Sequence, residues 1–185
     1  KGIQELRKAL ELYQQAGYLP NLAQTHSDLG VLLRASGNTA GARHHFEEAL
    51  AIWERVGNPL GMATVLNSIG VTYHHQGEYQ KALDIFSMAL RRAREAASDR
   101  LSGFILAGIG DAYLALGDAE RAMDAYRESE ELAEHAGDTF LKSYLMGVEA
   151  VAYLLQGNTA QALQLAREAF ERAREQHAQR EAAMY

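Results

Sequence analysis

The sequence predicts an all-α protein built from stacked helix hairpins, and three observations support this prediction. Glycine recurs at a constant interval of 40 residues, at Gly37, Gly77, Gly117 and Gly157, and such a period is typical of repeat proteins. Between these glycines, apolar residues are spaced three and four apart, as on one face of a helix. Only two prolines occur among 185 residues, and both lie between the apolar-periodic stretches, which leaves room for long helices.

Each 40-residue unit is expected to contain two helices, as the third unit illustrates. Its first apolar stripe consists of Leu106, Ile109, Tyr113 and Leu116. Gly117 is expected to end this helix, because glycine adopts the left-handed conformation without a steric penalty. Asp118 can then accept hydrogen bonds from the free N–H groups of the second helix. The second stripe consists of Ala122, Ala125, Tyr126, Ser129, Leu132, Ala133 and Ala136.

Small residues recur inside the helices as well as between them. Gly30, Gly70 and Gly110 fall in the middle of the first helix, where glycine costs roughly 1 kcal/mol relative to alanine. A cost repeated in three units indicates that the paired helix approaches closely there. The matching small residues of the second helix are Ala42, Ala82, Ala122 and Ala162. Aromatic side chains such as Phe46 and Tyr73 are expected to fill the wider gaps between units.

The expected organisation is a single array over residues 1–185. Its parts are the second helix of a truncated repeat at 1–17, four repeats at 22–57, 60–97, 99–137 and 139–177, and the start of a further helix at 178–185. Both ends cut through a repeat, whereas arrays usually end in polar capping units. We therefore expect a piece of a longer array or of a larger protein.

Composition excludes several classes of protein. Cysteine is absent, which excludes disulfides, thiolate metal sites and cysteine nucleophiles, and a reducing, cytoplasmic location is expected. The formal net charge of −6 argues against direct contact with nucleic acid. No apolar run reaches the length of a membrane span, and the N-terminal residues do not form a signal peptide.

No catalytic or metal-binding motif is present, so we expect no enzyme activity, no cofactor and no metal. The seven histidines include the adjacent pairs His44-His45 and His74-His75, whose side chains point about 100° apart on a helix. His26 has no acidic or histidine partner at a zinc-binding spacing along the sequence. The glycines of Gly108-Ile109-Gly110 lie inside a helical stripe with no preceding strand, unlike a dinucleotide-binding loop.

These positions together resemble the tetratricopeptide repeat in its 40-residue form. The second unit matches best, with Leu66, Ile69-Gly70, Tyr73, Ala82, Phe86 and Ala89 in the positions of the motif. The fourth unit departs most, because Ala150 replaces the glycine and Ala166 replaces the aromatic residue. The resemblance implies a right-handed superhelix, an α-α solenoid whose first helices line a concave groove.

The resemblance also implies which residues face this groove. They are Gln24, Ser27, Val31, Arg34, Thr64, Asn67, Val71, His74, Phe104, Ala107, Asp111, Leu114, Tyr144, Gly147, Val151 and Leu154. Several are apolar where a solvent-facing surface would be polar, which suits a bound peptide or amphipathic helix. Asn67 and Asp111 are the candidates for binding the backbone of a guest. Alternatively, neighbouring parts of the parent protein cover this surface.

The expected function is therefore a non-enzymatic scaffold that binds a protein or peptide. The 40-residue repeats resemble the sensor arrays of bacterial LuxR/MalT-type and antibiotic-regulatory (SARP) transcriptional activators, which implies a role in transcription regulation or signalling. The alternative is a stand-alone peptide-binding adaptor or a module like the quorum-peptide receptors. No lysine occupies the groove positions that clamp a carboxylate in chaperone-binding repeats, which argues against that partner. The severed first helix carries the apolar residues Ile3, Leu6, Leu10 and Tyr13, whose outer side is not fully covered, and we therefore expect end-to-end self-association.

Overall fold

The computed structural model describes residues 2–155 and 157–182, with backbone only at residues 155 and 176–182. Within these residues the chain consists of helices joined by short turns, with no strand. The helices are α1 (Gly2–Ala16), α2 (Leu19–Ala35), α3 (Thr39–Val56), α4 (Pro59–His75), α5 (Tyr79–Glu95), α6 (Asp99–Ala115), α7 (Ala119–His135), α8 (Thr139–Leu155) and α9 (Thr159–Ala182). The all-α prediction is confirmed.

A left-handed residue separates each helix from the next, at half the repeat period. These residues are Gly17, Gly37, Gly57, Gly77, Ala97, Gly117, Gly137 and Gly157. Ala97, with φ of 50°, is the one residue other than glycine with a positive φ among the described residues. The 20-residue series of left-handed residues ends at Gly157. At the next position of the series, His177, α9 continues without a break through Ala182. We expected a further helix to start at residue 178, and this is wrong because no glycine ends α9 there; residues 183–185 lie outside the described part.

Side-chain caps open several of the helices. Asn38 and Asp118 accept hydrogen bonds from the backbone N–H groups of Gly41 (3.0 Å) and Arg121 (3.1 Å), as the sequence predicts. Asn58 and Ser98 cap α4 and α6 in the same way. Both prolines, Pro20 and Pro59, lie in the first turn of a helix, where no N–H donor is needed. The cap residues therefore define where each hairpin turns.

The mid-helix glycines make room for an aromatic ring of the paired helix. A Cβ atom at Gly30 would lie 2.5 Å from the Phe46 ring, and one at Gly70 would lie 2.6 Å from the Phe86 ring. Gly110 and Tyr126 form the corresponding pair in the third unit, at 2.4 Å. The Phe86 ring also reaches the next unit, because a Cβ at Gly108 would lie 2.9 Å from it. One ring thus holds together the two helices of its own hairpin and the first helix that follows.

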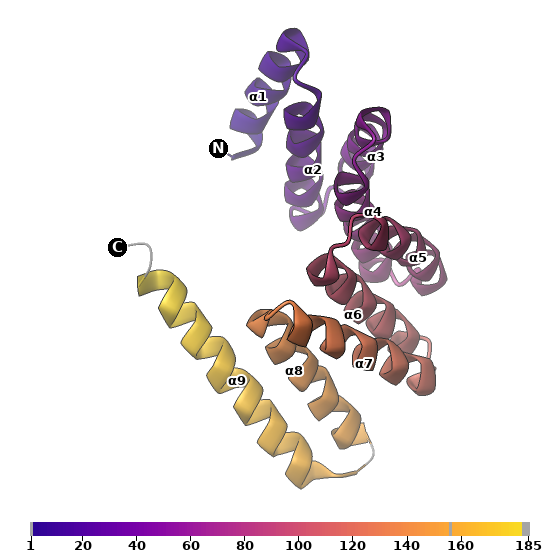
Figure 1. Cartoon of the computed structure of the whole chain (residues 1–185), viewed down its shortest axis with the longest axis vertical. Helices are drawn as coiled ribbons and strands as arrows, with labels where there is room; N and C mark the ends of the chain where they lie inside the picture. The colour runs from indigo at the N-terminus through magenta and orange to yellow at the C-terminus, as the bar shows by residue number, and fades with distance from the viewer. Residues whose placement is uncertain (1, 156, 183–185) are drawn as a thin grey trace.

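The hairpins stack along an arc that brings both ends of the chain to the same side (Figure 1). The hairpins are α2–α3, α4–α5, α6–α7 and α8–α9, and α1 packs against α2. Consecutive first helices approach one another, α2 with α4, α4 with α6, and α6 with α8. Among the described residues, no such approach joins consecutive second helices, α3 with α5 or α5 with α7. The first helices therefore line the tighter, inner side of the array. None of the described helices is long and apolar enough to cross a membrane.

Candidate partner-binding groove

The candidate site is the inner surface formed by α2, α4, α6 and α8, which we call the groove. Its first residues lie on α2 and differ in accessibility. Gln24 is exposed, and its side-chain amide donates to Asp28 Oδ1 at 2.8 Å. Val31 is also exposed. Ser27 is buried, and its hydroxyl donates to the carbonyl oxygen of Ala23 at 2.9 Å. Ser27 is therefore turned into the helix and offers nothing to a partner.

A basic cluster lies where the last turns of α2 and α4 meet. Arg34 Nη1 lies 3.5 Å from His75 Nδ1, and the His74 and His75 rings are 6.2 Å apart between centroids. Arg34 Nε and His74 Nε2 are both buried with no hydrogen-bond partner. Burial, followed by the nearby Arg34 guanidinium, lowers the pKa of His75, so this ring is neutral near pH 7. The cluster thus presents one fixed cation, Arg34, whereas the two unpaired nitrogen atoms lie beneath the surface.

The middle of the groove is lined by α4. Asn67 is half-buried, and the structure gives its side-chain amide no hydrogen bond. Thr64 is exposed, but its hydroxyl donates to the carbonyl oxygen of Leu60 within the helix. Val71 packs against the core formed by Phe86 and its neighbours, so it belongs partly to the interior. Asn67 is accordingly the polar side chain of α4 that remains able to bind a guest backbone.

Asp111 does not stand free at the groove floor as expected. Its Oδ1 accepts a hydrogen bond from the Tyr126 hydroxyl at 2.8 Å, and its Oδ2 accepts one from the Tyr144 hydroxyl at 2.5 Å. Burial, strengthened by the Asp111 carboxylate, raises the pKa of both tyrosines above the usual value of 10. The carboxylate therefore joins α6, α7 and α8, and its principal role is structural. This contact was not visible in the sequence, because Tyr126 occupies a position that predicts only a core ring.

The C-terminal half of the groove is apolar. Phe104 is half-buried against Phe140, with ring centroids 6.1 Å apart, and the Arg100 guanidinium lies 5.2 Å from its centroid. Leu114 packs against the core. Exposed side chains continue this surface on α8, at Tyr144, Val151 and Leu154. A hollow of about 280 Å³ lies between α8 and α9; its lining residues are Gly147, Ala150, Val151, Leu154, Thr159, Ala162, Leu163 and Ala166. Ala107, by contrast, is buried.

The structure also joins two histidines that the sequence analysis left without partners. His26 of α2 and His45 of α3 face each other, with 3.0 Å between their Nδ1 atoms. Burial, followed by the neighbouring rings, lowers the pKa of each. The pair lies between the two helices of one hairpin, so only knowledge of the hairpin register would have revealed it. Within the described residues, no group of three or more histidine, aspartate or glutamate side chains could hold a metal ion.

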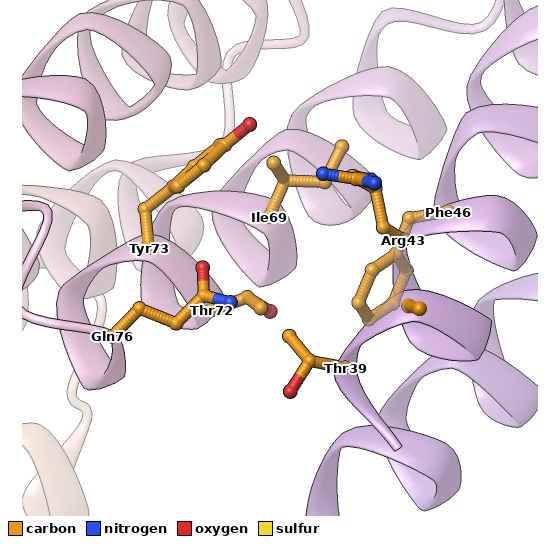
Figure 2. Close-up of a pocket in the computed structure, with 8 residues that line it drawn as sticks. Thr39, Arg43, Phe46, Ile69, Thr72, Tyr73 and Gln76 are labelled. Carbon is orange, nitrogen blue, oxygen red and sulfur yellow. The ribbon is translucent and has the colours of Figure 1, made fainter. Parts of the chain in front are cut away.

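A separate cavity of about 300 Å³ lies between α3 and α4, on the side of α4 that faces the preceding hairpin. Figure 2 shows Tyr73 and Gln76 on one side of it and Arg43 and Thr39 on the other. Arg43 occupies the position that Leu83 and Met123 hold in the next two units. A longer, charged side chain that stays exposed cannot fill this junction as leucine does, which accounts for the space.

Comparison with known proteins places this architecture among repeat families. A family model described as tetratricopeptide repeat matches residues 1–55 and 61–135, and a second one with the same description matches residues 144–168. No curated protein matches the sequence.

Several solved structures share the fold. BtubC (BKLC) from P. vanneervenii aligns with a TM-score of 0.79 at 17% identity, over 94% of this chain and 72% of that chain. Aspartyl phosphate phosphatase F from Bacillus subtilis aligns with a TM-score of 0.74 at 18% identity, over 92% of this chain and 54% of that chain. The apo form of RapI aligns with a TM-score of 0.74 at 15% identity, over 100% of this chain and 74% of that chain. At such identities, these similarities establish the fold alone.

Proposed function

The chain belongs to the tetratricopeptide repeat family, and we propose that it binds a peptide or helix of a partner protein in the groove. Repeats of this family generally serve as protein-interaction scaffolds without enzyme activity. We further propose that the chain is the sensor or regulatory segment of a larger bacterial signalling or transcriptional regulator.

The observation that carries the groove proposal is the contrast between its two halves. The half on α2 and α4 holds the Arg34 guanidinium and Asn67, whose side-chain amide has no hydrogen bond in the structure. The half on α6 and α8 presents aromatic and aliphatic side chains, several of them exposed. A guanidinium and a side-chain amide favour a partner that supplies acceptors, whereas exposed apolar side chains favour one that covers them. The guest would therefore be acidic or carbonyl-rich at one end and apolar at the other.

Selection from a displayed library of random peptides tests this proposal. We expect binders with an acidic segment and an apolar segment. Arg34→Gln should weaken their binding about tenfold and reduce its salt dependence, and Phe104→Ala should weaken it about tenfold without changing the salt dependence. Arg121→Gln is the matched control, because Arg121 lies on α7 against Tyr113, outside the groove. Binding that is lost with Arg121→Gln but kept with both groove variants contradicts the proposal.

The alternative is a stand-alone adaptor that resembles the quorum-peptide receptors. Such an adaptor would bind a peptide in the same groove but would not be joined to a domain that acts on DNA or carries an enzyme activity. The full-length gene product separates the two proposals. A helix-turn-helix and a phosphate-binding loop outside these residues support the regulator, and their absence supports the adaptor.

A further inference from the structure

The fourth unit lacks the aromatic ring that holds the other three together. Phe46, Phe86 and Tyr126 are buried over Gly30, Gly70 and Gly110. At the corresponding positions of the fourth unit, the chain carries Ala166 and Ala150. Ala166 is exposed instead of buried, and the 280 Å³ hollow between α8 and α9 is lined by both alanines.

The hollow has the size and chemistry of a site for an aromatic side chain. An apolar cavity of about 150 Å³ is enough to admit a benzene ring. The side chains around this hollow are almost entirely aliphatic, and Val151, Leu154 and Leu163 remain about half exposed. A ring entering from outside would cover these side chains and take the place that Phe46 takes in the first unit.

An exposed ring of the right kind lies one turn further along α9. Phe170 is 64% exposed, and residues four apart share a face of a helix. Leu163, Ala166 and Phe170 therefore form one stripe. Phe170 does not fill the hollow of its own chain, as its exposure shows. A twofold axis that crosses α9 between Ala166 and Phe170 places the Phe170 of each copy against the Ala166 of the other.

The stripe also continues an interface that the chain already uses. In the first two units, Leu50 and Leu90 hold the position of Phe170 in the repeat. Leu50 is partly buried and packs against the cores on both sides of the junction between hairpins. Leu90 packs against the core that contains Ile105 of the next first helix. The surface of α8 and α9 therefore corresponds to the surface by which the earlier hairpins pack against the next one, but here its apolar side chains are exposed.

We propose that a second copy of this chain covers this surface. The two copies form a twofold dimer through α8 and α9, and Phe170 of each fills the hollow of the other. A twofold interface is closed, so assembly stops at two copies. The interface shares Val151 and Leu154 with the C-terminal end of the groove, so the second copy and a groove ligand would compete for these two side chains.

Light scattering and sedimentation equilibrium on the chain and three variants test the dimer. Phe170→Glu removes the ring from an exposed position, and we expect the dimer dissociation constant to rise at least about a hundredfold, because each dimer contains the contact twice. The double variant Ala150→Gly, Ala166→Phe fills the hollow from within, and we expect a monomer with a higher Tm. Leu12→Glu is the matched control, because Leu12 is 65% exposed on α1 at the opposite end, and we expect it to remain dimeric.

Each other outcome overturns the proposal. A wild-type chain that stays monomeric at the highest soluble concentration excludes the dimer, and it points to a partner's helix as the occupant if N-acetyl-phenylalaninamide shifts the α8 and α9 amide signals. A dimer that survives in the double variant excludes insertion of the ring. Loss of the dimer in Leu12→Glu indicates a head-to-tail contact, and species larger than two copies indicate an open assembly.

Discussion

Ala97 is the residue whose backbone departs most clearly from the repeat pattern. It stands in the 20-residue series of helix-ending glycines and adopts a φ of 50°. The left-handed region costs an L-residue roughly 1–2 kcal/mol, whereas glycine enters it freely. Ala97→Gly is therefore expected to raise the free energy of unfolding by about 1 kcal/mol, measured by urea denaturation.

Gly77→Ala provides the opposite change at an equivalent position, where φ is 77°. It should lower the free energy of unfolding by about 1 kcal/mol or more. An equal free energy of unfolding in the wild type and Ala97→Gly would show that the left-handed backbone of Ala97 does not destabilise the folded chain.

The His26–His45 pair makes stability depend on pH. The folded chain lowers the pKa of both rings, chiefly by burial, so the folded state favours their neutral forms. Their contribution is present above the unfolded pKa of about 6.5 and is lost as the pH falls below it. We expect the Tm to fall between pH 7 and pH 5, and to fall less in His45→Gln. An equal change of Tm with pH in the wild type and in His45→Gln would rule out this pair as the origin of the pH dependence.

At the scale of the elements, Asp111 links the third hairpin to α8. Asp111→Ala leaves the buried Tyr126 hydroxyl without its acceptor, and we expect a loss of about 1–3 kcal/mol in the free energy of unfolding. Tyr144→Phe removes only the exposed arm and should cost less, about 0.5–1.5 kcal/mol. Hydrogen exchange should show the faster opening on α8 and α9. Uniform acceleration along the whole chain would contradict a local link.

The repeat pattern predicted the hairpins well because the features that form a hairpin lie close together in the sequence. Glycine at each turn, polar caps such as Asn38 and Asp118, and apolar stripes all act within a few residues of each other. Contacts between helices were harder to predict. The Asp111–Tyr126 and His26–His45 pairs depend on the register of a hairpin. Ser27 shares a face of α2 with the exposed Gln24 and Val31, yet it is buried and its hydroxyl donates to the carbonyl oxygen of Ala23. The helix break expected at position 177 came from extending the 20-residue series of helix-ending residues. This position holds His177 instead of glycine, and α9 continues through it.

At the scale of the whole molecule, the arc follows from unequal contacts. First helices touch across consecutive hairpins, whereas no such approach joins consecutive second helices in the part of the chain described. The inner wall is therefore shorter than the outer one, and the side chains of α2, α4, α6 and α8 converge on it. Sequence resemblance assigned sixteen residues of these helices to the groove; Ser27 and Ala107 among them are buried, and a binding role for the others stays a proposal.

Hydrogen exchange of the chain with and without a selected peptide tests this central claim most directly. Amides of α2, α4, α6 and α8 should gain protection when the peptide binds, with little change in α3, α5 and α7. Protection concentrated on the second helices, with the first helices unchanged, would contradict a guest bound in the groove.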